Sequence, residues 1–210
     1  MLTAASLATI EAHWAAFLGC TVEELRGQDI VVPHRGRGIF ILSRAGAVVA
    51  VPPGVAADRV VGPAFIGYLD EATFAEGDQI ESRLLDDGDA EVIEALRAAC
   101  EPLAWAEGGP AGTVAALGVF RGSTLAALSS YEIWSERIAH IGIVTHPAHR
   151  GRGLGTAAVR AMTRIALARK LVAQYRTLLA NAPSMAIARR LGFERYATTV
   201  SIGFSIREDA

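Results

Sequence analysis

The alternation of apolar and polar positions along the chain predicts a protein built from both helices and strands. Apolar residues at intervals of three and four predict helices, and shorter apolar runs bounded by glycine or proline predict strands. In the first half, the expected elements are a helix over residues 2–18, a short helix opened by a capping box at 21–24, strands over 38–45 and 47–51, a mixture of short helices with a strand near 65–68 inside 55–85, and a helix that follows 87–89 and reaches residue 100. In the second half, they are strands over 103–106, 113–121, 124–134, 138–145, 174–179 and 194–206, and helices over 154–169 and 182–190. This succession predicts an α/β or α+β fold.

Composition narrows the class of protein. Of the 210 residues, 51% are hydrophobic and 20% are charged, which is typical of a folded globular chain and excludes intrinsic disorder. No apolar run is long enough to cross a bilayer and the first residues lack a basic segment, so we expect a cytoplasmic protein that does not enter a membrane. The only cysteines, Cys20 and Cys100, are expected to be ordinary thiols, and we expect no metal site.

Charge is distributed unevenly along the chain. Residues 1–136 contain 8 basic and 19 acidic side chains, whereas residues 137–193 contain 10 basic and no acidic ones. A basic segment in a nearly neutral protein predicts an anion site, either for nucleic acid or for a phosphorylated cofactor. Because the segment has few aromatic residues, a compact phosphate ligand is favoured over nucleic acid.

A glycine-rich loop inside the basic segment is the strongest candidate for that site. A strand runs into Pro147, and the chain then passes through glycines 151, 153 and 155 into a helix. Amides at a helix start lack internal partners, and glycines let a ligand approach them, so the loop is expected to hold a pyrophosphate. A dinucleotide-binding loop would need a third glycine at Thr156 and an acidic residue before Glu194, and a P-loop would need Gly-Lys-Ser/Thr. Both are absent.

Two motifs together resemble the GNAT superfamily of N-acetyltransferases. The first is Ile143-Val-Thr-His-Pro-x-x-Arg-Gly-Arg-Gly-Leu-Gly155, and the second begins at Asn181 and closes in Leu-Gly-Phe193. The resemblance covers about residues 102–206. It implies a mostly antiparallel central sheet flanked by helices, with residues 102–210 forming the domain that binds acetyl-coenzyme A (acetyl-CoA). Residues 1–101 would then be a helical and β extension on the substrate side.

The resemblance also implies which residues contact the cofactor. The expected contacts are the backbone of Ile143, Val144 and Thr145, the loop residues Arg150, Gly151, Arg152, Gly153, Leu154, Gly155 and Thr156, and Asn181 and Ser184 at the start of the next helix. Asn181 has an alternative role as an N-cap, with Pro183 just inside the helix.

Acetyl transfer to an amine needs a base for the amine proton, a hydrogen-bond donor for the oxyanion and an acid for the leaving thiolate. His140 and the acidic Glu132 or Glu136 are candidate bases, and a strand amide near Val144 is a candidate donor. In many GNAT enzymes the acid is a tyrosine seven residues after the asparagine, where this chain has Ala188. Tyr196 and Tyr131 are possible substitutes.

The sequence therefore predicts an acyltransferase that moves an acetyl group from acetyl-CoA to an amine by direct attack in a ternary complex. A non-catalytic, regulatory CoA-binding module is the alternative, since Ala188 cannot donate a proton. The acidic first half suits a cationic acceptor, such as a polyamine, an aminoglycoside or a lysine-bearing peptide. We expect no nucleic-acid, membrane or metal partner, and the chain is compatible with a homodimer.

Overall fold

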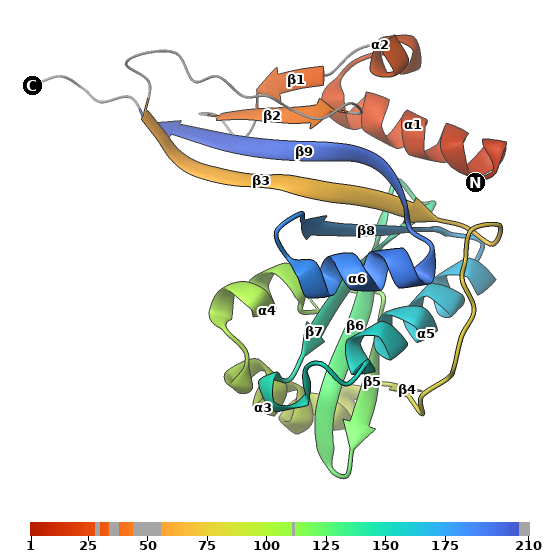
Figure 1. Cartoon of the computed structure of the whole chain (residues 1–210), viewed down its shortest axis with the longest axis vertical. Helices are drawn as coiled ribbons and strands as arrows, with labels where there is room; N and C mark the ends of the chain where they lie inside the picture. The colour runs from red at the N-terminus through yellow and green to blue at the C-terminus, as the bar shows by residue number, and fades with distance from the viewer. Residues whose placement is uncertain (28–29, 34–37, 44–55, 111, 206–210) are drawn as a thin grey trace, which may run out of the picture.

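The computed structural model describes residues 1–27, 30–33, 38–43, 56–110 and 112–205, which form one sheet with helices on both faces (Figure 1). The helices are α1 (Ala4–Leu18), α2 (Val22–Gly27), α3 (Ala90–Ala99), α4 (Pro102–Gly108), α5 (Leu154–Ala168) and α6 (Ala182–Leu191), with short 3-10 turns η1 (Asp87–Asp89) and η2 (Pro147–His149). The strands are β1 (Ile30–Pro33), β2 (Gly38–Ser43), β3 (Ala56–Leu69), β4 (Arg83–Leu84), β5 (Ala115–Arg121), β6 (Thr124–Trp134), β7 (Ile138–Thr145), β8 (Val172–Leu178) and β9 (Glu194–Ser205). None of the helices in these ranges is both long and apolar enough to cross a bilayer.

The sheet has nine strands in the order β1-β2-β9-β3-β8-β7-β6-β5-β4. Every neighbouring pair is antiparallel except β7 and β8, which run parallel, so the expected mostly antiparallel sheet is confirmed. The long strand β3 comes from the first half of the chain, yet it lies between β8 and β9 from the second half.

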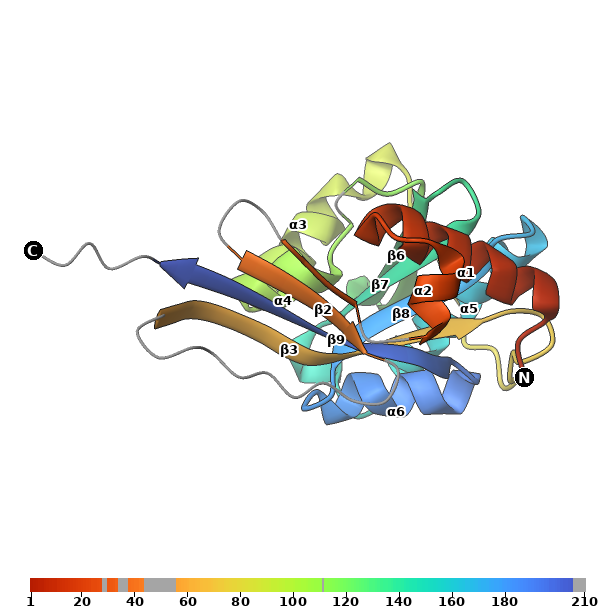
Figure 2. The same ribbon diagram turned by 90° about the horizontal axis from the view of Figure 1, so that it is seen from above.

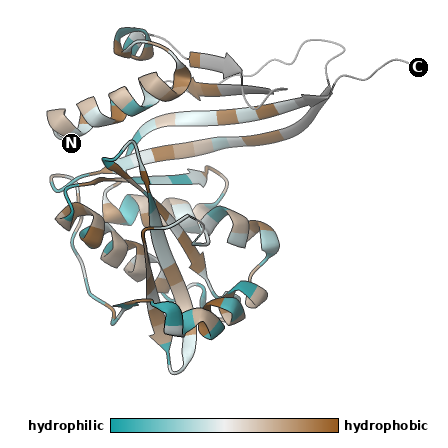
Figure 3. Ribbon diagram, turned by 180° about the vertical axis from the view of Figure 1, so that it is seen from behind, coloured by the Kyte–Doolittle hydropathy of each residue, from teal (hydrophilic) through white to brown (hydrophobic). Residues whose placement is uncertain are grey.

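Three apolar clusters hold the helices against the sheet. Helices α5 and α6 bury one face over the central strands, where Leu154, Ala158 and Met162 of α5 are buried. Helix α1 covers the opposite face of the sheet, as Figure 2 shows from above, and α3 and α4 pack beside it on a smaller cluster. Apolar segments run along the central strands, and hydrophilic segments are more frequent on helices and loops (Figure 3).

Most predicted elements are confirmed, including the capping box, in which Thr21 and Glu24 exchange hydrogen bonds of 2.8 and 3.2 Å. The strand predicted over 103–106 is wrong, because Pro102 occupies the first helical position and begins α4 instead. The short helices expected inside 55–85 are also wrong for the described residues, where β3 and an irregular segment lie. The strand predicted over 47–51 lies outside the described residues.

Helix α4 meets β7 through a close backbone contact. A Cβ atom on Gly108 would lie 2.2 Å from the carbonyl oxygen of Ile143, and one on Gly142 would lie 2.9 Å from the carbonyl oxygen of Gly108. Only glycine fits at these two positions without a shift of the backbone. The contact fixes the last turn of α4 directly over the second half of β7.

We expect Gly108→Ala to lower the free energy of unfolding by about 1 to 3 kcal/mol, because the added methyl group overpacks the contact. Gly27→Ala is the matched control, since a Cβ atom there meets nothing within 4 Å. Alanine is the better helix former, so the control should be as stable as the wild type or more stable. Urea denaturation measures both, and an unchanged midpoint for Gly108→Ala would contradict the close contact.

Candidate functional site

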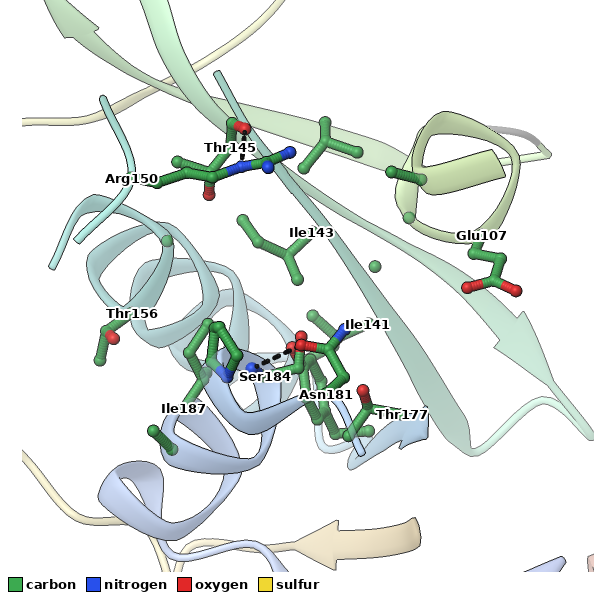
Figure 4. Close-up of a pocket in the computed structure, with 18 of the residues that line it drawn as sticks. Glu107, Ile141, Ile143, Thr145, Arg150, Thr156, Thr177, Asn181, Ser184 and Ile187 are labelled. Carbon is green, nitrogen blue, oxygen red and sulfur yellow. Dashed lines mark hydrogen bonds between the residues drawn. The ribbon is translucent and has the colours of Figure 1, made fainter. Parts of the chain in front are cut away.

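Strands β7 and β8 lie side by side only over their first four residues. Their parallel register begins with Ile138 opposite Val172 and ends with Ile141 opposite Tyr175. Beyond these residues both strands continue without pairing to each other, so a cleft opens in the middle of the sheet. A cavity of about 670 Å³ lies at this cleft, lined by both strands, by the starts of α5 and α6 and by α4 (Figure 4).

The register of β6 with β7 determines which backbone groups of β7 face the cleft. The amide of His146 donates to the carbonyl of Ala126 on the β6 side at 2.9 Å. Hydrogen-bonded pairs alternate with non-bonded pairs in an antiparallel ladder, so Val144 is also bonded to β6. The amides and carbonyls of Ile143 and Thr145 therefore point toward the cleft, where β8 no longer pairs with them.

The glycine-rich loop closes one end of the cavity. Gly151 and Gly153 have φ angles of 75° and 77°, in the left-handed region that favours glycine. Gly153 is the N-cap of α5, and no side chain of the described residues caps this helix. The amides of residues 154–156 therefore lack intrahelical partners and are available to an anion, which the positive end of the helix dipole would favour.

Close packing holds this loop against the end of β7. A Cβ atom on Gly155 would lie 2.9 Å from the Oγ1 atom of Thr145, so the glycine lets α5 begin directly beside the strand. The Nε atom of Arg150 donates to the Thr145 carbonyl at 3.3 Å, as the dashed line in Figure 4 marks. Arg150 lines the cavity, whereas the exposed Arg152 does not.

The start of α6 forms the facing wall of the cavity. Asn181 is its N-cap and accepts a hydrogen bond from the Ser184 amide through Oδ1 at 3.2 Å, and Pro183 lies in the first turn. All three residues line the cavity. The side-chain amide nitrogen of Asn181 has no hydrogen bond within the described part of the chain, so the N-cap role leaves a donor for a ligand.

His140 lies on β7 and lines the cavity. Its Nδ1 atom is in hydrogen-bond contact with the Oε1 atom of Gln174 on β8. In the tautomer in which Nδ1 donates to this oxygen, the neutral ring keeps its lone pair on Nε2. Desolvation lowers the pKa of His140; the bond to Gln174 and the charge of Glu132 oppose this, and Arg176 adds to it. The lowered pKa favours the neutral form of the imidazole.

Aromatic rings support His140 from the side of α1. The ring of Trp134 stacks on His140 with centroids 4.2 Å apart and an interplanar angle of 14°. His13 of α1 stacks in turn on Trp134 at 5.6 Å. Glu132 is the cross-strand neighbour of His140 in the register of β6 with β7, but it does not line the cavity. It acts on the imidazole through its charge alone.

Tyr175 lines the cavity at the point where the strands part. It is 2% exposed and packs against Phe193 with ring centroids 5.3 Å apart. Burial raises the pKa of Tyr175 to about 12, and hydrogen bonding with Ser184 offsets part of that rise. The hydroxyl therefore stays protonated across the physiological range.

The other two tyrosines considered as proton donors do not line the cavity. Tyr196 lies on β9 in the cluster beneath α1, where its ring meets Tyr68 edge-on at 5.6 Å. Tyr131 is fully buried, and its hydroxyl accepts a hydrogen bond of 2.6 Å from Arg169.

Sequence reasoning missed Tyr175, Arg176 and Glu107, all of which line the cavity. The strand that carries the first two was predicted, but its register with β7 was not readable from the sequence. Glu107 was missed because α4 was predicted as a strand. The parity of residues 174–176 along a strand was not a sufficient signal, since it places Tyr175 and Arg176 on opposite sides of the sheet.

Comparison with known proteins identifies a family model that matches the chain and solved structures with a similar fold. The model of the Acetyltransferase (GNAT) family matches residues 70–193, which begin just after β3 and end just before β9. A solved structure from Novosphingobium aromaticivorans, assigned to the GNAT family of acetyltransferases, is 23% identical with a TM-score of 0.58 and covers 82% of this chain and 76% of that one. A GNAT-family acetyltransferase from Colwellia psychrerythraea is 13% identical, with a TM-score of 0.58 and coverages of 71% and 58%.

A tandem GNAT protein from the clavulanic acid biosynthesis pathway is 14% identical with a TM-score of 0.54, and the match covers 90% of this chain and 67% of that one. No curated protein sequence matches. Because these sequence identities are low, the structural neighbours show the fold alone.

Proposed function

The chain belongs to the GNAT family of acetyltransferases, and from this premise we propose that it transfers the acetyl group of acetyl-CoA to an amine by direct attack in a ternary complex. The observation that carries the proposal is the cleft between β7 and β8, which ends at the uncapped start of α5. An extended arm can lie in the unpaired gap while its pyrophosphate meets the free helix amides.

The residues of the cleft fit this cofactor. The amides of residues 154–156 and the left-handed glycines 151 and 153 would hold the pyrophosphate. The cleft-facing backbone of Ile143 and Thr145 would pair with the pantetheine arm as a neighbouring strand does. Asn181 and Ser184 would contact the arm from the α6 side.

In the proposed reaction, the amine nitrogen bonds to the thioester carbonyl carbon and the carbon–sulfur bond breaks. His140 accepts the amine proton on Nε2. The amide of Ile143, which the register directs to the cleft, would stabilise the oxyanion in place of the amide near Val144. Tyr175 would protonate the departing thiolate, and its phenolate regains a proton from solvent or from His140.

We expect Tyr175→Phe to lower kcat about tenfold, the cost of one hydrogen bond lost from the leaving group. Because the pKa of Tyr175 is raised to about 12, the wild type should show no loss of activity from this group at neutral pH. Tyr131→Phe is the matched control, since its hydroxyl lies outside the cavity lining. Equal kcat values for Tyr175→Phe and the wild type would remove Tyr175 from the mechanism.

The proposed function is tested by incubating the protein with acetyl-CoA and a panel of amines and measuring released thiol. Acetyl-CoA should also raise the melting temperature, because a ligand that binds only the folded state stabilises it. Stabilisation without thiol release from any amine would indicate a non-catalytic binding module. Absence of both would overturn the proposal.

A further inference from the structure

Arg176 is a cation at the cavity that forms no ion pair with any residue that the structure describes. It follows Tyr175 on β8, immediately past the last pair with β7, and lines the cavity. No described residue forms a hydrogen bond or a salt bridge with its guanidinium. Arg176 is exposed, and desolvation lowers the pKa of its guanidinium while the charge of Glu107 raises it.

The side chains of Arg176 and His140 emerge on the same side of the sheet. His140 is opposite Gln174 in the register, and Arg176 is two residues farther along β8. Alternate residues of a strand face one side, so the bases of the two side chains are separated by about 7 Å in the strand direction and by about 5 Å between the strands. A small molecule of one to a few carbons can reach both groups.

Glu107 adds a carboxylate to the same cavity from α4 (Figure 4). It attracts Arg176 electrostatically without forming an ion pair with it. The contact of Gly108 with Ile143 fixes this turn of α4 over β7. The acceptor side of the cavity thus offers one cation, one anion and a neutral imidazole, an arrangement complementary to a zwitterion.

We propose that the acceptor is an amino acid whose amine is presented to His140 and whose carboxylate is bound by Arg176. The inference rests on the proposed acetyl transfer and names its acceptor class. A guanidinium binds a carboxylate through two parallel hydrogen bonds, which offsets the loss of its hydration. A polyamine or an aminoglycoside would instead bring a second positive charge toward Arg176, so the cavity disfavours the cationic acceptors suggested by the acidic first half of the chain.

The phosphates of acetyl-CoA are a poorer match for Arg176. Along the strand direction, Arg176 lies at the height of Gly142, the residue after Ile141, whereas α5 begins beyond Thr145. Three or more strand residues separate the two levels, roughly 10 Å at the rise of a β-strand. Arg176 therefore lies at the end of the cleft where the acetyl group and the acceptor meet.

The test uses pairs of acceptors that differ only in the carboxylate. Each common L-amino acid is compared with its C-terminal amide, with acetyl-CoA as donor and released thiol as readout. For the best substrate, we expect kcat/KM to be about 10- to 100-fold higher for the acid than for the amide, as one charge-assisted contact predicts. Arg176→Gln should remove that preference by lowering kcat/KM for the acid alone, and Arg176→Lys should retain part of it.

Several outcomes would overturn the inference. One is equal use of acids and amides by the wild type, and another is an unchanged preference in Arg176→Gln. A higher KM for acetyl-CoA in Arg176→Gln, with the preference intact, would assign the residue to the cofactor. Acetylation of amides or diamines alone would overturn the inference and leave the proposed function standing, whereas no thiol release from any amine would overturn both.

Two controls complete the design. Arg121→Gln removes an exposed arginine from the end of β5, outside the cavity lining, and should change neither the preference nor kcat. Thermal unfolding of Arg176→Gln should match the wild type, because no hydrogen bond or salt bridge to a described residue is lost.

Discussion

Replacing His140 with glutamine is expected to lower kcat by about 10²- to 10⁴-fold, the usual contribution of a general base. Glutamine keeps a polar side chain beside Gln174 but offers no basic nitrogen at the Nε2 position. Stabilisation by acetyl-CoA should be unchanged, because the loop proposed to bind the pyrophosphate lies at the other end of the cleft. Steady-state kinetics with the best acceptor and a thermal shift with acetyl-CoA measure the two quantities separately.

The pH dependence separates a catalytic from a structural role for His140. Its pKa is lowered below 6.5, mainly by desolvation, with Arg176 acting in the same direction and Gln174 and Glu132 against it. The base form therefore persists at neutral pH, and activity should be lost only as the pH falls through the lowered pKa, below 6.5. The variant should lack this acidic limb, and added imidazole should restore part of its activity. A variant that keeps both the limb and the wild-type kcat would exclude His140 as the base.

The second large effect is expected at the glycine-rich loop. Gly153→Val should raise KM for acetyl-CoA by about 10- to 100-fold. Gly153 has a φ of 77°, a conformation that costs a branched residue roughly 1–2 kcal/mol. The new side chain would also stand beside the amides that are expected to bind the pyrophosphate. The loop would therefore change its conformation, and the pyrophosphate would no longer reach the amides.

Gly122→Val is the matched control for this variant. Gly122 lies in the turn between β5 and β6 with a φ of 60°, and, as at Gly153, a Cβ atom there would meet nothing within 4 Å. Both variants should therefore lose similar stability, but only Gly153→Val should change KM. An equal KM in the two variants would mean that the loop does not hold the cofactor.

The sequence predicted well those parts of the fold that depend on local pattern. The hairpin of β6 and β7 was predicted with the correct bounds, since its apolar runs end at the turn from residue 135 to 137. The loop into α5 was predicted because glycine spacing and a helix start are both local signals. The helix α4 was missed because four apolar residues fit either a strand or one turn of a helix, and only its contact with β7 decides between them.

The candidate site was predicted to the extent that its residues lie in motifs. The glycine loop and Asn181 belong to such motifs, and they do line one cavity. Tyr175 and Arg176 belong to none, because their position depends on where β7 and β8 stop pairing. That point is a property of strand register over some 30 residues of separation, which single-sequence patterns do not contain. The division of the chain at residue 101 remains a prediction.

The position of β3 has a consequence for how the cleft is assembled. Past Tyr175, β8 has lost β7 and is held by β3 alone, with Ile66 opposite Arg176 and Ala64 opposite Leu178. The ribosome therefore synthesises β3 about 100 residues before β8, the strand that β3 supports. Such a high contact order slows folding, and the edge of β3 that pairs with β9 stays open until β9 has been made. The wall that carries the proposed acid and the proposed carboxylate-binding arginine is thus completed long after its supporting strand has been synthesised.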